Sequence, residues 1–259
     1  MQNNFYDEVL KIVKKTRDIS LPKYGLASVD GQKTDSAADV VTQVDVDIEN
    51  FLKSEFAKLD PTIDFVGEES GGDKSKNKFW LVDPVDGTAH FVRGMPFCTT
   101  MVALIENGEV IFSAIYDFVN DVMYHAAKGK GSFKNEEKIQ VSNREISSSY
   151  LCWNSHIEKK ENFEIFQKLQ KKSVMIKTVS AGFEFAMIAS GKLEGMASFD
   201  PHGKDYDFAP GVLLVSEAGG IVKNIGSDKY DFTNLDFIAA NPLIYKTLTE
   251  GGDVIFPIK

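Results

Sequence analysis

The chain has 259 residues, of which 43% are hydrophobic and 26% charged, a composition typical of a folded globular protein. Its 38 acidic residues exceed its 29 basic ones and give a net charge of −9, which disfavours binding to nucleic acid or to an anionic membrane surface. Two cysteines and four scattered histidines disfavour a disulfide scaffold and a zinc site of nitrogen and sulfur ligands, so carboxylates would have to hold any metal. No apolar run approaches the ~18 residues of a membrane span and no signal peptide is visible, so we expect a cytoplasmic protein without a membrane anchor.

The first half of the chain is predicted to form two helices followed by a set of strands. Apolar residues at helical spacing predict helices from Phe5 to about Ile19 and from Asp39 or Thr42 to Pro61, separated by a mobile polar loop over residues 26–38. Apolar runs predict strands at Ile63–Val66, Phe79–Val82, Thr99–Ile105, Val110–Tyr116, Val122–Ala126 and Gly131–Val141. Asn107-Gly108 favours a hairpin between two of these strands.

The second half alternates strands with helices. Strands are predicted at Tyr150–Trp153, Val174–Val179, Leu193–Phe199, Ile221–Asn224 and Phe237–Ala240. Helices are predicted at Glu161–Lys171, at Ser180–Ser190, after Asp207 through Ala218, and at Pro242–Glu250. The whole pattern indicates a mixed α/β protein with two sheets and layers of helix. Because no long linker interrupts it, we expect one domain over residues 1–259, made of two halves, 1–145 and 146–259.

The clearest functional signal is the segment Trp80-Leu-Val-Asp83-Pro-Val-Asp86-Gly-Thr88. A buried strand delivers two aspartates at its carboxyl end, where ligands bind in open α/β sheets. Pro84 stiffens the turn between them, Gly87 lets the backbone approach a ligand, and the amides from Thr88 onward can open a short helix that attracts an anion. Hard oxygen ligands beside a phosphate-sized nest suggest a magnesium phosphate site, although a solvated acidic turn would also explain this segment alone.

Two weaker signals accompany this segment. Gly67-Glu68-Glu69-Ser70 also follows a strand, and Asp207 precedes an apolar helix that it would normally cap. In this order and spacing, the three motifs resemble the inositol monophosphatase family. The resemblance extends over nearly the whole chain through Val41-Thr42-x-x-Asp45, Phe91-x-x-Gly-x-Pro96-Phe, Gly129-x-Gly131-Ser-Phe and Glu217-Ala-Gly-Gly220. It implies a layered αβαβα sandwich with two β-sheets, of the sugar-phosphatase type.

The resemblance also implies a role for each matching residue. Two or three Mg²⁺ ions would be bound: the first by Glu68, Asp83 and the main-chain carbonyl of Val85, the second by Asp83, Asp86 and Asp207, and a weaker third by Glu68 with Asp45 through water. The amides of Gly87 and Thr88 would bind the phosphate. Glu68 and the Thr88 hydroxyl, with Asp45 behind them, would orient the attacking water, and Glu69 would have a supporting role. Ser180, Ala181 and Asp200 would line the substrate pocket.

Three departures from the family pattern bear on the substrate. Tyr206 stands where the family usually has tryptophan, and a tyrosine can still pack beside the site. Asp200 stands where inositol-specific members carry glutamate, and His202 and Lys204 add positive charge that would suit a substrate with a second anionic group. Ala89-His90 follows the Asp-Gly-Thr motif, in place of the lysine of relatives that act on adenosine 3′,5′-bisphosphate, so that subclass is disfavoured.

The resemblance therefore implies a lithium-sensitive, Mg²⁺-dependent hydrolase of a small phosphate monoester. Inositol 1-phosphate is the first substrate to test. Fructose 1,6-bisphosphate and histidinol phosphate are alternatives, as is a regulatory or binding role on a phosphatase fold. The family is commonly dimeric, so we expect a homodimer, for which the apolar strand Met101–Ile105 could supply the interface.

Other interpretations are weaker. Aspartyl-phosphate phosphatases need Asp-x-Asp before Gly-Thr, whereas the spacing here is one residue longer, and Asp45-Val-Asp47 lies in a helical pattern. A calcium loop from Asp45 would lack its glycine, at Asn50, and its final glutamate, at Phe56. Residues expected to have structural roles only are Trp80, Trp153, Cys98, Cys152 and His125.

Overall fold

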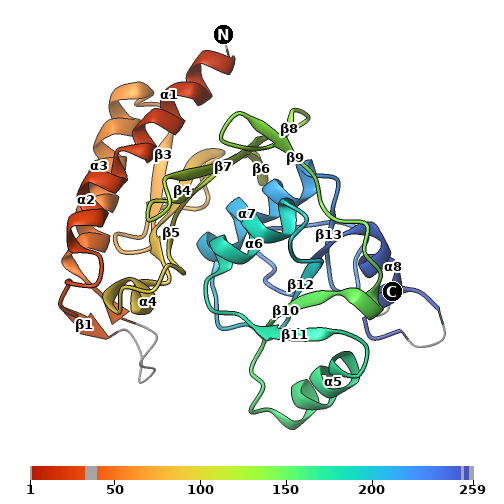
Figure 1. Ribbon diagram of the computed structural model, residues 1–259. Coiled ribbons are helices and arrows are strands. Elements are labelled where there is room, and N and C mark those ends of the chain that lie inside the picture. Colours follow the sequence, from red (N-terminus) through yellow and green to blue (C-terminus); the bar gives the residue numbers. More distant parts are fainter. Residues whose placement is uncertain (1, 33–39, 252–253, 257–259) are drawn as a thin grey trace.

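A seven-stranded sheet dominates the amino-terminal part of the protein, as seen in a computed structural model that describes residues 2–32, 40–251 and 254–256 (Figure 1). Its strands lie in the order β3-β4-β5-β6-β7-β8-β9. They are β3 (Asp64–Gly67), β4 (Lys78–Asp86), β5 (Thr99–Glu106), β6 (Glu109–Asp117), β7 (Val122–Ala127), β8 (Gly131–Lys134) and β9 (Glu137–Ile139). The pair β3–β4 is parallel and the later neighbours are antiparallel, so short turns connect most of the sheet.

Helices cover the outer face of this sheet. They are α1 (Gln2–Lys14), α2 (Thr16–Ser20) and α3 (Gln43–Leu59). Val9 of α1 and Ile48 of α3 are fully buried and belong to one apolar cluster with Trp80 and Val82 of β4. Since side chains alternate along a strand, the residues between them on β4 face the opposite side of the sheet and need a second cover.

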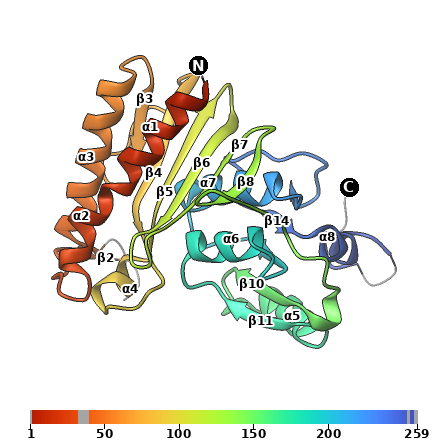
Figure 2. The same ribbon diagram turned by 45° about the horizontal axis from the view of Figure 1, so that its top comes forward.

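That second cover is a central helical layer, formed by α6 (Ala181–Ala189) and α7 (Asp205–Glu217). Leu81 of β4 packs in one apolar cluster with Ala209 of α7. Another cluster joins both helices to both sheets, because it contains Met101 and Ile115 of the first sheet together with Met196 of the second. The two helices therefore lie between the sheets, as Figure 2 shows, and their apolar surfaces are buried on two sides.

The second sheet has five strands in the order β11-β10-β12-β14-β13. They are β10 (Tyr150–Asn154), β11 (Val174–Lys177), β12 (Gly195–Ser198), β13 (Ile221–Asn224) and β14 (Phe237–Ala240). On its outer face, Leu169 of α5 (Lys160–Gln170) and Ile244 of α8 (Pro242–Thr249) pack against Trp153. The order of layers is thus helix, sheet, helix, sheet, helix, which confirms the predicted αβαβα sandwich.

Several predicted boundaries differ from the structure for local reasons. The helix predicted over 5–19 is interrupted at Lys15, between α1 and α2. The strand predicted over 131–141 is a hairpin of β8 and β9, because Asn135 takes a left-handed conformation (φ 53°) that turns the chain. Of the loop predicted over 26–38, residues 33–38 lie outside the described residues, as does the alternative cap Asp39. Thr42 is the N-cap of α3.

The remaining elements are short. A two-stranded sheet pairs β1 (Gly31–Gln32) with β2 (Val40–Val41), and α4 (Thr88–Val92) follows β4, as the sequence suggests. The 3-10 turns are η1 (Leu21–Lys23) and η2 (Ile146–Ser148). None of the helices within the described ranges has the length and apolar character needed to cross a membrane.

Four of the five residues expected to have structural roles are interior residues and the fifth, His125, is partly exposed, whereas one surface expectation is wrong. Trp80, Trp153, Cys98 and Cys152 are at most 1% exposed, and both cysteines are free thiols. The apolar strand Met101–Ile105 is equally buried, in the middle of the seven-stranded sheet and covered on both faces. It therefore cannot provide a dimer interface.

Candidate active site

Two aspartates of the site lie at the carboxyl end of β4. This strand extends to Asp86, four residues beyond the run predicted from apolar residues alone. Its register against β5 shifts between Asp83 and Asp86, so the strand bulges at this point. Pro84 lies inside the bulge, where its missing amide costs no ladder hydrogen bond. The bulge thus brings the two carboxylates, three positions apart, to the same end of the sheet.

The third aspartate comes from the central helical layer. Helix α7 begins at Asp205 with Lys204 as its N-cap, so Asp207 is the third residue of its first turn and not the cap that the sequence suggested. Its Oδ2 accepts a hydrogen bond from the Lys204 amide at 2.5 Å, which fixes the side chain against the helix start. The helix therefore supplies a carboxylate that points back toward the strand ends.

Asp83, Asp86 and Asp207 form one cluster, in which an oxygen of each carboxylate lies within 4.8 Å of the others. Asp83 is 1% and Asp86 6% exposed. Burial raises the pKa of Asp83 well above its usual range, and the charges of Glu68 and Asp207 raise it further. Burial likewise raises the pKa of Asp207, and the charge of Asp86 adds to this effect. Three acids in this position favour either protons or a cation.

The donor set fits a hard divalent cation. Asp83 Oδ1 is buried and has no hydrogen-bond partner among the described residues, so this oxygen can serve as a metal ligand without breaking a contact. Mg²⁺ prefers carboxylate oxygens, and a cation would remove the repulsion that shifts these pKa values. The predicted ligand Val85 lies between the two strand aspartates, and its main-chain oxygen lies 2.9 Å from Thr88 Oγ1.

The amino terminus of α6 holds Asp86 in place. Ser180 Oγ donates to Asp86 Oδ2, the Gly182 amide donates to the same oxygen at 2.9 Å, and the Ala181 amide donates to Oδ1 at 3.2 Å. These bonds oppose the pKa rise that burial causes in Asp86. The structure thus places Ser180 and Ala181, predicted to line a substrate pocket, against a predicted metal ligand. Their contact with substrate stays a prediction.

The partly buried Thr88 pairs with the buried Asp45 beside the cluster. Thr88 Oγ1 lies 2.9 Å from Asp45 Oδ1, and Asp45 Oδ2 accepts from the amide and hydroxyl of Thr42 at 2.8 and 2.7 Å. Asp45 is fully buried, and burial raises its pKa to about 6 in spite of these hydrogen bonds. An ionised Asp45 would draw the Thr88 proton toward itself and leave the hydroxyl oxygen free to accept a proton from water.

Glu68 lies in the loop after β3, and a neighbouring glutamate that the sequence analysis missed holds this loop. Glu49 of α3 is 3% exposed and accepts hydrogen bonds from the amides of Glu69 and Ser70, both at 2.8 Å. A side chain at Gly67 would place Cβ 2.2 Å from the Glu49 carboxyl carbon, so only glycine permits this approach. The available signal was the i, i+4 spacing of Asp45 and Glu49 on the buried stripe of a helix.

Gly87 begins the predicted phosphate-binding turn. It is the left-handed N-cap of α4 (φ 82°), and a Cβ there would lie 2.3 Å from the Phe97 carbonyl oxygen. Both the backbone conformation and the space therefore require glycine. The amides of Gly87 and Thr88 lie at the start of a helix, so the helix has no carbonyl one turn earlier to accept their hydrogen bonds. They are therefore suited to binding an anion.

Asp200 is separate from the aspartate cluster in its interactions. Its carboxylate binds Lys159 Nζ at 2.6 and 2.8 Å and Asn162 Nδ2 at 2.9 Å. The pKa of Asp200 is lowered, mainly by the hydrogen bond from Lys159. The structure thus pairs this predicted substrate ligand with residues at the start of α5. Tyr206 is half-buried, and the charges of Glu68 and Asp207 raise its pKa beyond the effect of burial, which places it beside the cluster.

Comparison with known proteins agrees with this geometry. The model of the inositol monophosphatase family matches residues 3–252. Inositol monophosphatase 1 of Mus musculus is 32% identical over 80% of this chain and 79% of its own, and inositol-1-monophosphatase of Bacillus subtilis is 30% identical over 82% and 83%. Among solved structures, the Thermotoga maritima IMPase superposes with a TM-score of 0.85 at 25% identity, over 95% of each chain. The chain therefore belongs to the inositol monophosphatase family, whose members are phosphoric monoester hydrolases.

Proposed function

We propose that this protein hydrolyses a small phosphate monoester with Mg²⁺, and that inositol 1-phosphate is its substrate. The observation that carries the proposal is the cluster of the buried Asp83 and Asp86 with the partly buried Asp207, in which Asp83 Oδ1 has no hydrogen-bond partner within the described part of the chain. A buried group of acids is costly unless a cation binds there. A phosphate dianion would be repelled by these acids alone and attracted once cations neutralise them.

The metal ligands of this proposal come from three elements. Asp83, Asp86 and the Val85 carbonyl lie on β4, Glu68 follows β3, and Asp207 begins α7. Two or three Mg²⁺ ions bound there would neutralise the phosphate, acidify a water and stabilise the leaving alkoxide. Supporting contacts fix the ligands: α6 donates to Asp86, and the loop that carries Glu68 is held through Glu49.

The chain's own residues would prepare the attacking water. Glu68 and the Thr88 hydroxyl orient it, and Thr88 passes its proton toward Asp45, which is 2.9 Å away. The pKa of Asp45, about 6, is close to neutrality, as a general base requires. A water activated in this way needs no covalent phosphoenzyme, so it would displace the alcohol directly.

The substrate would lie between the strand ends of the seven-stranded sheet and those of the five-stranded sheet. The amides of Gly87 and Thr88 would bind the phosphate, and Ser180, Ala181 and Asp200 would contact the alcohol portion. Asp200 would have to give up or share its bond to Lys159 in order to accept a hydroxyl hydrogen bond.

Fructose 1,6-bisphosphate is the second candidate substrate. A relative from Thermotoga maritima, 27% identical over 92% of each chain, bears the name fructose-1,6-bisphosphatase/inositol-1-monophosphatase. In this protein Lys204 is exposed, and its amide bonds to Asp207, so a cationic side chain begins next to the cluster. Such a charge would favour a substrate with a second phosphate.

The test is phosphate release from a panel of esters, measured as kcat/KM with Mg²⁺. The panel contains inositol 1-phosphate, fructose 1,6-bisphosphate and histidinol phosphate. We expect turnover of inositol 1-phosphate with the highest kcat/KM, and near-complete loss in Asp83→Asn. Absence of turnover with every ester would refute the enzymatic proposal and favour a regulatory or binding role, and a phosphoenzyme trapped with beryllofluoride would refute direct attack by water.

We also propose that the protein is a homodimer of single-domain chains in the cytoplasm, and that Li⁺ inhibits it. The free, buried state of Cys98 and Cys152 supports a reducing compartment. Sedimentation at several concentrations measures the dimer. Titration of Li⁺ against Mg²⁺ in the phosphate-release assay measures the inhibition, and an unchanged rate would contradict it.

A further inference from the structure

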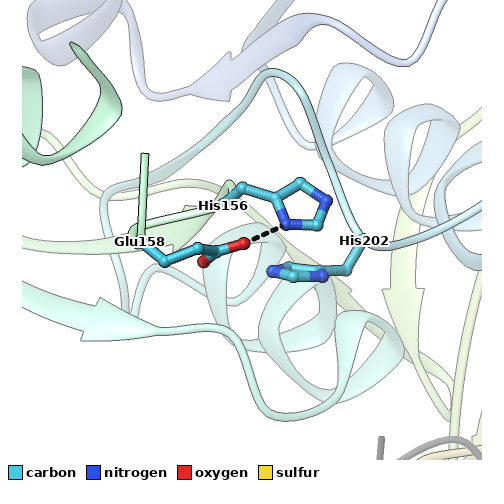
Figure 3. A group of neighbouring side chains, drawn as sticks. All are labelled: His156, Glu158 and His202. Carbon is cyan, nitrogen blue, oxygen red and sulfur yellow. Dashed lines mark hydrogen bonds and ion pairs between the residues drawn. The ribbon is translucent and has the colours of Figure 1, made fainter. Parts of the chain in front are cut away.

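A second group of side chains that could hold a metal ion lies in two loops at the end of the five-stranded sheet, outside the aspartate cluster. It consists of His156, Glu158 and His202, drawn in Figure 3. His156 and Glu158 follow β10, and His202 follows β12. Because β10 and β12 are parallel neighbours, with Asn154 paired to Ser198, their carboxyl ends open the two loops side by side.

Backbone contacts fix the two loops to one another. The Phe199 amide donates to the Asn154 carbonyl at 3.1 Å, and the His156 amide donates to the Asp200 carbonyl at 3.4 Å. The His202 amide donates to Asn154 Oδ1, also at 3.4 Å. The backbone that carries the three side chains is therefore arranged before any ligand binds.

The side chains converge on one point. One ligand atom from each lies within 4.8 Å of the other two. His156 Nδ1 is 2.6 Å from Glu158 Oε1, and the two imidazole rings are 3.8 Å apart between centroids, at an angle of 49°. Glu158 and His202 are exposed and His156 is partly so, which gives an ion direct access from solvent.

We propose that His156, Glu158 and His202 bind a divalent transition-metal ion, for which Zn²⁺ is the probe. Two imidazoles and one carboxylate are a ligand set that Zn²⁺ accepts, with a fourth position left to water. Imidazole nitrogen favours Zn²⁺, Ni²⁺ or Cu²⁺ over Mg²⁺, whereas the aspartate cluster offers oxygen alone. The proposal therefore assigns two chemically distinct cation sites to the protein and does not rest on its hydrolytic function.

The present geometry needs only side-chain adjustment to receive the ion. Bonds of 2.0–2.1 Å in a tetrahedral site separate two ligand atoms by roughly 3.3 Å, so the short Nδ1···Oε1 contact would open slightly. The ion would take the place of the hydrogen bond between His156 Nδ1 and Glu158 Oε1. Burial lowers the pKa of His202, and His156 and Lys177 lower it further, against the opposing charges of Glu158 and Asp200. This favours the neutral imidazole that a metal requires.

The test is titration of the full-length protein with Zn²⁺ by calorimetry, in millimolar Mg²⁺. It is repeated in an Asp83→Asn background, which disables the aspartate cluster. We expect one Zn²⁺ per chain in both backgrounds. Glu158→Gln and His202→Asn should each weaken binding by more than about tenfold. Glu161→Gln, an exposed neighbour outside the group, is the matched control and should bind as the parent does.

A complementary readout is the visible spectrum of bound Co²⁺, whose intensity reports tetrahedral coordination. His202→Asn should abolish this band, and circular dichroism would verify that the variant is folded. Unchanged Zn²⁺ affinity in both Glu158→Gln and His202→Asn would overturn the proposal. Loss of all Zn²⁺ binding in Asp83→Asn would also overturn the proposal, since the ion would then belong to the aspartate cluster. Absence of Zn²⁺ binding to the unmodified chain would overturn it as well.

Discussion

Asp45→Asn tests the proposed route of the water proton. The asparagine oxygen can replace Oδ2 and keep both hydrogen bonds from Thr42, at 2.8 and 2.7 Å. Its amide nitrogen then faces Thr88 Oγ1 and donates to it. Thr88 would turn its own proton to the Val85 carbonyl, 2.9 Å away, so no polar atom is left unpaired. The substitution therefore removes the base while preserving the local structure.

The expected size of the effect follows from the loss of general-base catalysis, which contributes roughly 100- to 10,000-fold to a rate. Stability should respond differently. Because burial raises the pKa of Asp45 from 3.8 to about 6, the folded state holds the extra proton between these values, and wild-type stability falls as pH rises through them. The difference between a pKa of 3.8 and one of about 6 corresponds to about 3 kcal/mol. Asp45→Asn lacks this titration and should be no less stable than wild type above about pH 7.

The assay is kcat at saturating Mg²⁺, together with urea unfolding at acid and neutral pH. Saturation separates loss of the base from weakened metal binding. Asp47→Asn is the matched control, since Asp47 lies on the exposed side of the same helix and bonds only Gln43 among the hydrogen bonds described for it. A kcat reduced less than about tenfold would refute the proton route. A large fall in unfolding free energy would show that the loss of activity is structural.

Three further predictions concern the metal ligands and the contacts that hold them. Asp83→Asn should abolish turnover and weaken Mg²⁺ binding. It should not lower the melting temperature of the metal-free protein, because it removes a buried charge. A variant with wild-type activity would contradict the assignment of Asp83 as a metal ligand. Glu49→Gln should lower the unfolding free energy by about 1.5–3 kcal/mol and raise the Mg²⁺ concentration needed for half activity, since one of the amides of Glu69 and Ser70 loses its acceptor. The control is Glu55→Gln, a partly exposed residue of the same helix that pairs with Lys58 and makes no described contact with this loop. Equal behaviour of the two variants would refute the role of Glu49. Removal of Mg²⁺ by a chelator should lower the melting temperature more at about pH 8 than at about pH 6, because protons on the buried aspartates compete with the metal at the lower pH. Scanning calorimetry at both pH values measures the change in melting temperature. A change that does not depend on pH would contradict the prediction.

Local sequence patterns were sufficient to predict most helices and strands. Where the predicted bounds were wrong, the structure gives the physical reason. The buried run Phe79–Val82 marked β4 correctly, but the strand continues to Asp86 because pairing with β5 resumes after the bulge. The strand predicted over 131–141 became a hairpin, since apolar periodicity does not record the left-handed turn at Asn135. Asp207 resembled a helix cap because cap preference is a local property, whereas α7 begins two residues earlier and Lys204 is its cap.

Relations across the fold could not be seen in the sequence. Nothing in the spacing of Ser180 and Ala181 indicated that they donate to Asp86, about 95 positions away along the chain. Glu49 was not among the site residues expected from the sequence, although the close approach of Gly67 places it under the loop that carries Glu68. The histidine site was equally hidden, since His156 and His202 meet only through the parallel pairing of β10 with β12.

The sequence by itself determined the layered class of the fold and the family, because periodicity, turn residues and the Asp-Pro-Val-Asp-Gly-Thr segment are local and specific. It also determined which acids are candidates for the site. Only the tertiary structure decided which of them converge, since a carboxylate cluster depends on strand register, a bulge and the position of a helix from the other half. It also decided that Asp200 binds Lys159, because competing partners become available only when the chain is folded.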